Sequence, residues 1–126
     1  MLRIAGIQRH SDPDQEFVLL KNQGLMKTHL RGHMIADENA FGGQRLSDRV
    51  FVFADDVVIP PAAYVMVVTG IGENGWGKSS DGSLVYYAFW NKNRAVWAED
   101  SCPIHVLGVL HSKPAPGVQW AAAAAR

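Results

Sequence analysis

Residues 59–70 read Ile-Pro-Pro-Ala-Ala-Tyr-Val-Met-Val-Val-Thr-Gly, a run of apolar residues bounded by prolines and a glycine. Residues 63–69 are mostly β-branched, aromatic or otherwise apolar, which is typical of a strand. Pro60 and Pro61 must precede the strand or lie at a sheet edge, because proline cannot donate a hydrogen bond to a strand ladder. The stretch therefore predicts a strand that follows the two prolines and ends before Gly70.

Seven further runs have the same character, and turn residues separate them. They cover residues 2–7, 16–21, 28–36, 49–53, 84–90, 95–98 and 104–110. No window of a dozen residues keeps a helical period, and the alanine run 121–125 is too short to form a stable helix alone. The sequence therefore predicts an all-β fold, a sandwich or barrel, with about eight strands and no significant helix.

Length and composition restrict the class of protein. The chain has 126 residues, enough for one domain, and its 12 basic and 12 acidic residues cancel. Zero net charge disfavours a general nucleic-acid binder, and the apolar content disfavours disorder. The single cysteine, Cys102, excludes an intrachain disulfide and a cysteine-based zinc cage.

The order of the segments predicts one domain over residues 1–112 and a Pro/Ala-rich tail over residues 113–126. Residues 1–10 alternate between apolar and polar and contain no continuous apolar core, so we expect no signal peptide. No stretch approaches 18 apolar residues, so we expect no membrane partner and a cytoplasmic location.

Residues 72–79 read Gly-Glu-Asn-Gly-Trp-Gly-Lys-Ser and match the phosphate-loop pattern G-x-x-x-x-G-K-[ST]. That chemistry requires a helix whose N-terminus faces the phosphates and which begins at Lys78. Residues 79–83 are instead Ser-Ser-Asp-Gly-Ser, which favours a loop. We therefore interpret residues 70–83 as a hairpin-type loop. Nucleotide binding through Gly72–Ser79 remains an alternative that needs a helix after Lys78.

Histidine, cysteine and acidic residues predict neither a cofactor nor a metal site. His29 and His33 would share one face of a strand, but no cysteine or carboxylate completes a local ligand set. Cys102 lies in an acidic turn, where a reactive thiolate is disfavoured. Glu16 and Asp37 are expected to be solvated at strand edges unless the fold joins them as a pair. We expect no catalytic residues and no enzymatic activity.

The positions of three of the four tryptophans indicate whether they lie in strands or in a loop. Trp90 and Trp97 fall in strand-like runs and are expected in the core or in strand pairs. Trp76 lies in the glycine-rich loop, where no core requires it, beside Lys78. A loop aromatic offers contact area at low entropic cost, so Trp76 and Lys78 are the candidate binding residues.

The ordered set of segments resembles the lamin tail domain, of the type found in bacterial proteins. The similarity extends from about Leu2 to Leu110 and rests on residues 16–22, 30–37, 51–53, 59–70 and 89–91. His33 stands where that family usually has tryptophan, and residues 92–94 replace its usual Gly-Asp turn. Leu30 and Ile35 have opposite parity, so both can point inward from one strand only if a bulge intervenes, for which Gly32 is suited.

The resemblance implies an immunoglobulin-like β-sandwich of Greek-key topology that acts as a non-catalytic binding or tethering module. Its expected partner is a protein, bound by the loop that carries Trp76 and Lys78 or by an exposed sheet edge. A nucleic-acid contact module is the alternative. It requires five cations to converge on one face: Lys21, Lys27, Arg31, Lys92 and Arg94.

Overall fold

The computed structural model describes residues 1–38, 40, 49–98 and 102–108. The whole of the expected C-terminal tail, residues 113–126, lies outside these residues, as does the expected domain boundary at residue 112. Every element with described bounds is a strand. The all-β prediction is therefore confirmed, although the described residues form ten strands where about eight were expected.

The strands are short and follow the alternating apolar runs of the sequence. In chain order they are β1 (Leu2–Gln8), β2 (Phe17–Asn22), β3 (Thr28–His29), β4 (His33–Asp37), β5 (Val50–Val52), β6 (Val58–Ile59), β7 (Tyr64–Val68), β8 (Gly75–Lys78), β9 (Leu84–Phe89) and β10 (Ile104–Gly108).

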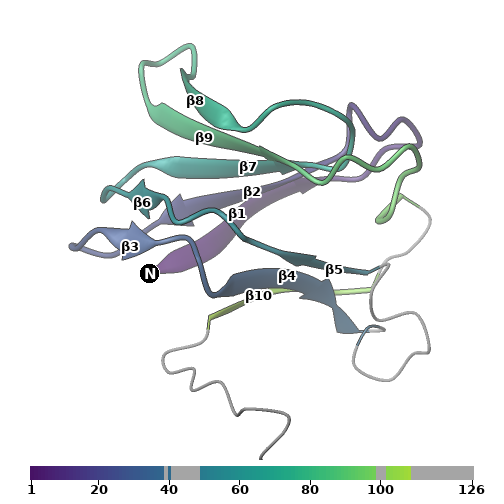
Figure 1. The fold of residues 1–126 in the computed structure, drawn as a ribbon, viewed down its shortest axis with the longest axis horizontal. Helices are drawn as coiled ribbons and strands as arrows, with labels where there is room; N and C mark the ends of the chain where they lie inside the picture. The colour runs from purple at the N-terminus through teal and green to yellow at the C-terminus, as the bar shows by residue number, and fades with distance from the viewer. Residues whose placement is uncertain (39, 41–48, 99–101, 109–126) are drawn as a thin grey trace, which may run out of the picture.

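The strands form two main sheets that lie one above the other (Figure 1). The larger sheet has the order β1-β2-β7-β9-β8, and the smaller has the order β10-β4-β5. A third, two-stranded sheet joins β3 to β6. All neighbours are antiparallel except β7 and β9, which run parallel. The architecture is therefore a two-layer all-β fold.

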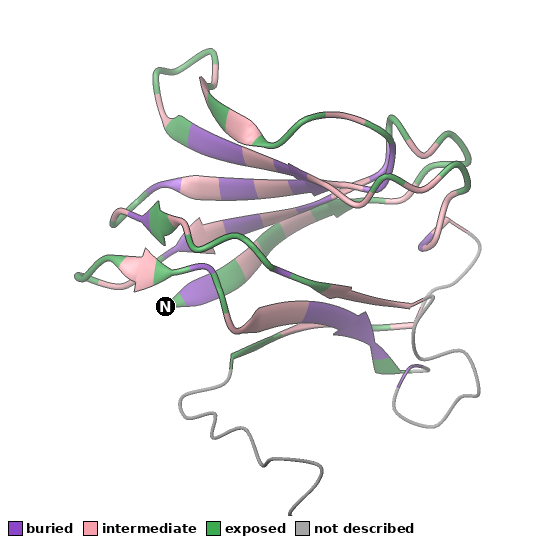
Figure 2. Ribbon diagram, in the orientation of Figure 1, coloured by how far each residue is buried: buried purple, intermediate pink, exposed green. Residues whose placement is uncertain are grey.

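The core lies between the two main sheets, where period-2 alternation turns one face of each strand inward (Figure 2). Buried side chains come from both layers: Val18, Leu20, Val65 and Val67 from the larger sheet, and Ile35 and Ile104 from the smaller. Each such side chain stabilises the fold by about 1.5–3 kcal/mol relative to an exposed position. This core fixes which residues of the larger sheet face inward.

The expected continuous strand over residues 28–36 is divided in two. A turn separates β3 from β4, and Gly32 within it adopts φ = 91°, a left-handed conformation that favours glycine. Leu30 and Ile35 are both fully buried, and the turn rather than a bulge accounts for their opposite parity.

Two other segments differ from prediction. Residues 95–98 were expected to form a strand, but they form no ladder with another strand. Residues 70–83 were expected to be a loop, but Gly75–Lys78 form β8 and pair with β9. Glycine has low strand propensity, so the sequence gives no local signal for β8, and its pairing with β9 overrides that propensity.

Candidate functional site

Strand β8 is the last strand of the larger sheet and pairs only with β9 (Figure 1). Its other side pairs with no strand in the described part of the chain. An edge of this kind presents a row of backbone N–H and C=O groups to any approaching chain. The direction of these groups identifies which residues of β8 can form hydrogen bonds with an added strand.

Two hydrogen bonds establish the direction in which the backbone groups of β9 point. The N–H of Trp90, just after β9, donates to the carbonyl of Val68 in β7 (2.9 Å). The N–H of Phe89 donates to the side chain of Asn74, just before β8 (2.9 Å). Successive residues of a strand direct these groups to opposite sides, so the odd-numbered residues of β9 face β8.

The register then separates the residues of β8 into two kinds. Tyr87 and Val85 of β9 lie opposite the two glycines of β8, so these pairs exchange the ladder hydrogen bonds. Trp76 and Lys78 alternate with the glycines. Their N–H and C=O groups therefore point away from β9, toward the open edge of the sheet.

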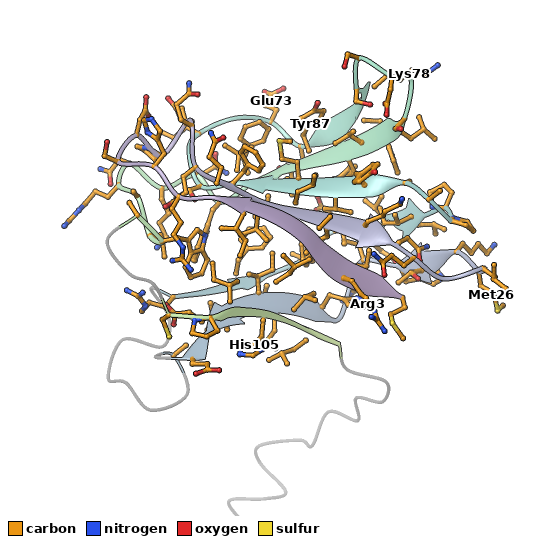
Figure 3. The ribbon with its side chains drawn as sticks, turned by 180° about the vertical axis from the view of Figure 1, so that it is seen from behind. Arg3, Met26, Glu73, Lys78, Tyr87 and His105 are labelled. Atoms are coloured by element: carbon orange, nitrogen blue, oxygen red, sulfur yellow. The ribbon has the colours of Figure 1, made fainter. Side chains whose placement is uncertain are left out.

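The side chains of β8 are distributed unequally between its two faces. Trp76 and Lys78 alternate with the glycines and so share one face of the strand, where Trp76 meets the buried Tyr86, and the exposed Lys78 lies at the end of the strand (Figure 3). Trp76 is 46% exposed, and its ring meets Tyr86 edge-on with centroids 5.3 Å apart. On the opposite face, a Cβ at Gly77 would lie 2.9 Å from the Tyr87 ring, so that ring occupies the space beside the glycine.

A cavity of about 150 Å³ opens near the start of β8. Its walls are mainly apolar and come from segments far apart in the sequence: Leu30, residues 51–55, Asn74, Tyr86, Ala88 and Phe89. Asp55 supplies the charged group. Its Oδ2 accepts hydrogen bonds from the Asn74 side-chain amide and from the Tyr86 hydroxyl, both at 2.9 Å.

These contacts fix the charges at the cavity. The hydrogen bond from Asn74, followed by that from Tyr86, lowers the pKa of Asp55 below its usual value. Burial, followed by the bond to Asp55, raises the pKa of Tyr86 to about 12. At neutral pH, Asp55 is therefore an anion and Tyr86 a neutral donor. The arrangement provides an apolar recess with a fixed negative charge, beside an exposed indole.

The phosphate-loop interpretation lacks its required helix. Residues 79–82 form a turn in which the N–H of Ser79 donates to the carbonyl of Ser83 (2.9 Å), and β9 follows directly. No helix begins at Lys78, so the segment Gly72–Ser79 lacks the following helix that a phosphate loop requires.

The histidines do not converge on a shared site. His29 lies in β3, exposed, with its Nδ1 3.2 Å from Asp56, whereas His33 lies half-buried in β4, with its Nδ1 3.2 Å from the carbonyl of Leu30. The expected common strand face is therefore wrong, because the turn at Gly32 divides the segment. Within the described ranges, no group of three His, Cys, Asp or Glu residues could hold a metal ion.

Glu16 and Asp37 are both buried, so their expected solvation is wrong. Glu16 accepts hydrogen bonds from the Thr69 hydroxyl (2.8 Å) and from the N–H groups of Val96 and Trp97 (2.9 and 3.0 Å). These bonds explain why residues 95–98 need no strand ladder.

Asp37 has different partners. It accepts a hydrogen bond from the N–H of Ala40 (3.0 Å) and forms an ion pair with Arg49. The two acidic residues are therefore separate structural anchors and do not act as a pair.

Trp90, Trp97 and Cys102 pack against or bond to other parts of the fold. Trp97 is 2% exposed in the core, and its ring centroid lies 5.5 Å from that of the half-buried Trp90. Cys102 is half-buried, and its carbonyl accepts a hydrogen bond from Arg9 (2.9 Å). In the part of the chain that the structure describes, no helix has the length and apolar character needed to cross a membrane.

The cations expected to form a nucleic-acid surface do not all gather in one place. Lys21 lies opposite Tyr64 at the start of β7, whereas the backbone of Lys92 bonds to Thr69 just past the end of β7. The five residues of β7 separate these positions by roughly 16 Å. Lys21 and Lys92 therefore lie at opposite ends of the larger sheet.

No family model matches the chain, and neither does any curated protein or solved structure. The fold and the site themselves define the class: a two-layer all-β protein in which the edge strand β8 carries an exposed tryptophan. Sequence reasoning identified Trp76 and Lys78 but missed Asp55, Asn74 and Tyr86. Their only signal was the position of Asp55 directly after a strand-like run.

Proposed function

We propose that this protein is a non-catalytic interaction module that binds an extended segment of a protein partner along β8. The observation that carries the proposal is the outward direction of the N–H and C=O groups of Trp76 and Lys78. A partner strand can pair with these groups and extend the larger sheet, a recurring mode of peptide recognition.

Side chains beside the edge would select the partner. Alternate residues of an added strand point to the face that carries Trp76 and Lys78. An apolar residue of the partner would pack on Trp76, because an exposed aromatic ring gives a large contact area. Lys78 at one end and the anionic Asp55 near the other favour a segment with opposite charges at its two ends.

The opposite edge of the larger sheet is less suited to strand addition. Strand β1 contains a register shift between Ile4 and Gly6, and the exposed Arg3 lies on it. Bulges and edge charges are devices that hinder pairing with another chain. These features favour β8 as the site at which the partner strand adds.

We further infer that the two layers correspond to an immunoglobulin-like Greek-key sandwich of the lamin tail type, from a bacterial protein. Support comes from the order of the sequence segments and from the two facing sheets. Modules of that family bind or tether other proteins, which agrees with strand addition at β8. This argument from fold is secondary to the geometry of the edge.

Substitution of Lys78 by proline tests strand addition. The Lys78 N–H points away from β9, so proline removes a group that a partner would use and spares the ladder with β9. Peptides selected from a random display library on the wild-type protein should bind Lys78→Pro about tenfold more weakly. This is the effect expected when one backbone hydrogen bond between the partner and β8 is lost.

The matched control is Lys78→Ala, which removes the charge but keeps the N–H. It should retain affinity within about threefold, as expected for an exposed charge. Dissociation constants from fluorescence anisotropy and thermal melts of both variants check the prediction. Equal affinities for the proline and alanine variants, or a selection that yields no binding peptide, would contradict the proposal.

A further inference from the structure

The turn between β2 and β3, residues 23–27, presents two adjacent apolar side chains to solvent. Leu25 is 97% exposed and Met26 is 77% exposed, the highest values among the large hydrophobic residues that the structure describes. Figure 3 shows Met26 at the extreme end of the molecule. We call residues 23–27 the apolar tip. Two neighbouring exposed hydrophobic side chains form a small apolar surface that can be buried against a partner.

The conformation of the apolar tip is built by a buried side chain. The amide of Asn22 donates to the carbonyls of Met26 (3.0 Å) and Ile59 (2.9 Å). Its Oδ1 accepts a hydrogen bond from the N–H of Gly24 (3.1 Å). Because Asn22 is fully buried, these bonds tie the turn to the core. The backbone that carries Leu25 and Met26 is therefore held in place by Asn22.

Three basic residues lie in the apolar tip or on the strand ends that adjoin it. Lys27 is exposed directly after Met26, and Arg3 and Lys21 lie opposite each other on β1 and β2 at the same end of the larger sheet. Residues 17–36 contain no aspartate or glutamate. The chain has zero net charge, yet the described residues at this end of the molecule include three cations close together in the sequence or across one strand pair.

Two carboxylates belong to neighbouring segments, and both have partners. Asp56 pairs with His29 of β3 (3.2 Å). Asp81, in the turn between β8 and β9, bonds to the Ser79 hydroxyl and to the N–H of Ser83. Strands β7 and β9 separate that turn from β2. Neither carboxylate pairs with a cation of the apolar tip.

We propose that the apolar tip docks on an anionic lipid bilayer. Leu25 and Met26 enter the boundary between headgroups and acyl chains, while Arg3, Lys21 and Lys27 contact the anionic headgroups. Charge complementarity favours an anionic surface. The aliphatic character of the tip favours lipid over nucleic acid, which aromatic side chains bind by stacking. This surface uses no residue of β8 and is independent of strand addition there.

Vesicle co-sedimentation of the full 126-residue chain tests the proposal. Wild type should sediment with phosphatidylcholine vesicles that contain about one-third phosphatidylserine, and more weakly with phosphatidylcholine alone. Binding should weaken as ionic strength rises toward about 0.15 M, because salt screens the headgroup contacts. The double substitution Leu25→Ser and Met26→Ser should reduce partitioning at least about tenfold. Lys27→Ala should reduce it about fivefold.

The matched control is Ile71→Ser. Ile71 is 69% exposed but follows β7 at the other end of the sheet, so its replacement should leave partitioning unchanged. The proposal is overturned if wild type does not sediment with the anionic vesicles at low salt, whatever else the tip binds. Equal partitioning of wild type and the double variant would also overturn it.

Discussion

Replacement of Glu16 by alanine is expected to lower the free energy of unfolding by about 3–5 kcal/mol, because three buried donors lose their acceptor together. The Glu16 carboxylate is fully buried and accepts hydrogen bonds from the Thr69 hydroxyl and from two backbone N–H groups, those of Val96 and Trp97. It therefore fixes the segment after β9 against the start of β2. Urea denaturation of wild type and variant measures the effect.

Two milder substitutions separate the charge of Glu16 from its size. Glu16→Gln keeps the volume but places an NH₂ group where an acceptor is needed, so we expect a smaller loss than for alanine. Thr69→Val removes only the hydroxyl donor and should cost about 1 kcal/mol. A loss below about 1 kcal/mol for Glu16→Ala would show that the carboxylate does not anchor this segment.

Replacement of Trp97 by alanine is expected to lower the free energy of unfolding by about 3–5 kcal/mol. The indole is 2% exposed in the core and lies against Trp90, so alanine leaves a cavity that the two sheets cannot close. Trp97→Phe fills part of that space and should cost less. Trp76→Ala, at a position 46% exposed, should stay within about 1 kcal/mol of wild type.

The same denaturation experiment compares all three tryptophan variants. Similar losses for Trp97→Ala and Trp76→Ala would contradict the placement of Trp97 in the core and of Trp76 at the surface.

Local sequence pattern predicted the strands that form the centre of the larger sheet. Residues 17–22 and 64–68 are runs of mostly apolar residues bounded by turn signals, and both form strands in which buried and half-buried side chains alternate. Residues 95–98 look like a strand for the same reason, but the N–H groups of Val96 and Trp97 bond to Glu16 instead. Strand-like composition does not specify which acceptor a backbone group finds.

The candidate site depended on long-range pairing that local pattern cannot show. Trp76 and Lys78 were identified as exposed loop residues, but their role at an edge follows only from the register with β9. Asp55 meets Asn74 across 19 residues and Tyr86 across 31. Glu16 was misplaced because charged residues are rarely buried unless several donors converge on them, and its donors come from distant segments.

The two proposed surfaces use different parts of the larger sheet. Strand β8 forms one edge of the sheet, and the apolar tip follows β2, with β7 and β9 between them. A chain that used both would hold a protein partner beside an anionic membrane. Substitutions in the tip should therefore leave peptide affinity unchanged, and Lys78→Pro should leave vesicle binding from the tip intact.

Amide hydrogen exchange of β8, followed residue by residue by NMR, tests the open edge most directly. In the free protein, the amides of Trp76 and Lys78 should exchange rapidly, whereas the amide of Gly77, bonded to β9, should be protected. A bound peptide should protect Trp76 and Lys78 as well. If these two amides are protected in the free protein and Gly77 is not, the edge does not present the groups on which the proposed function depends.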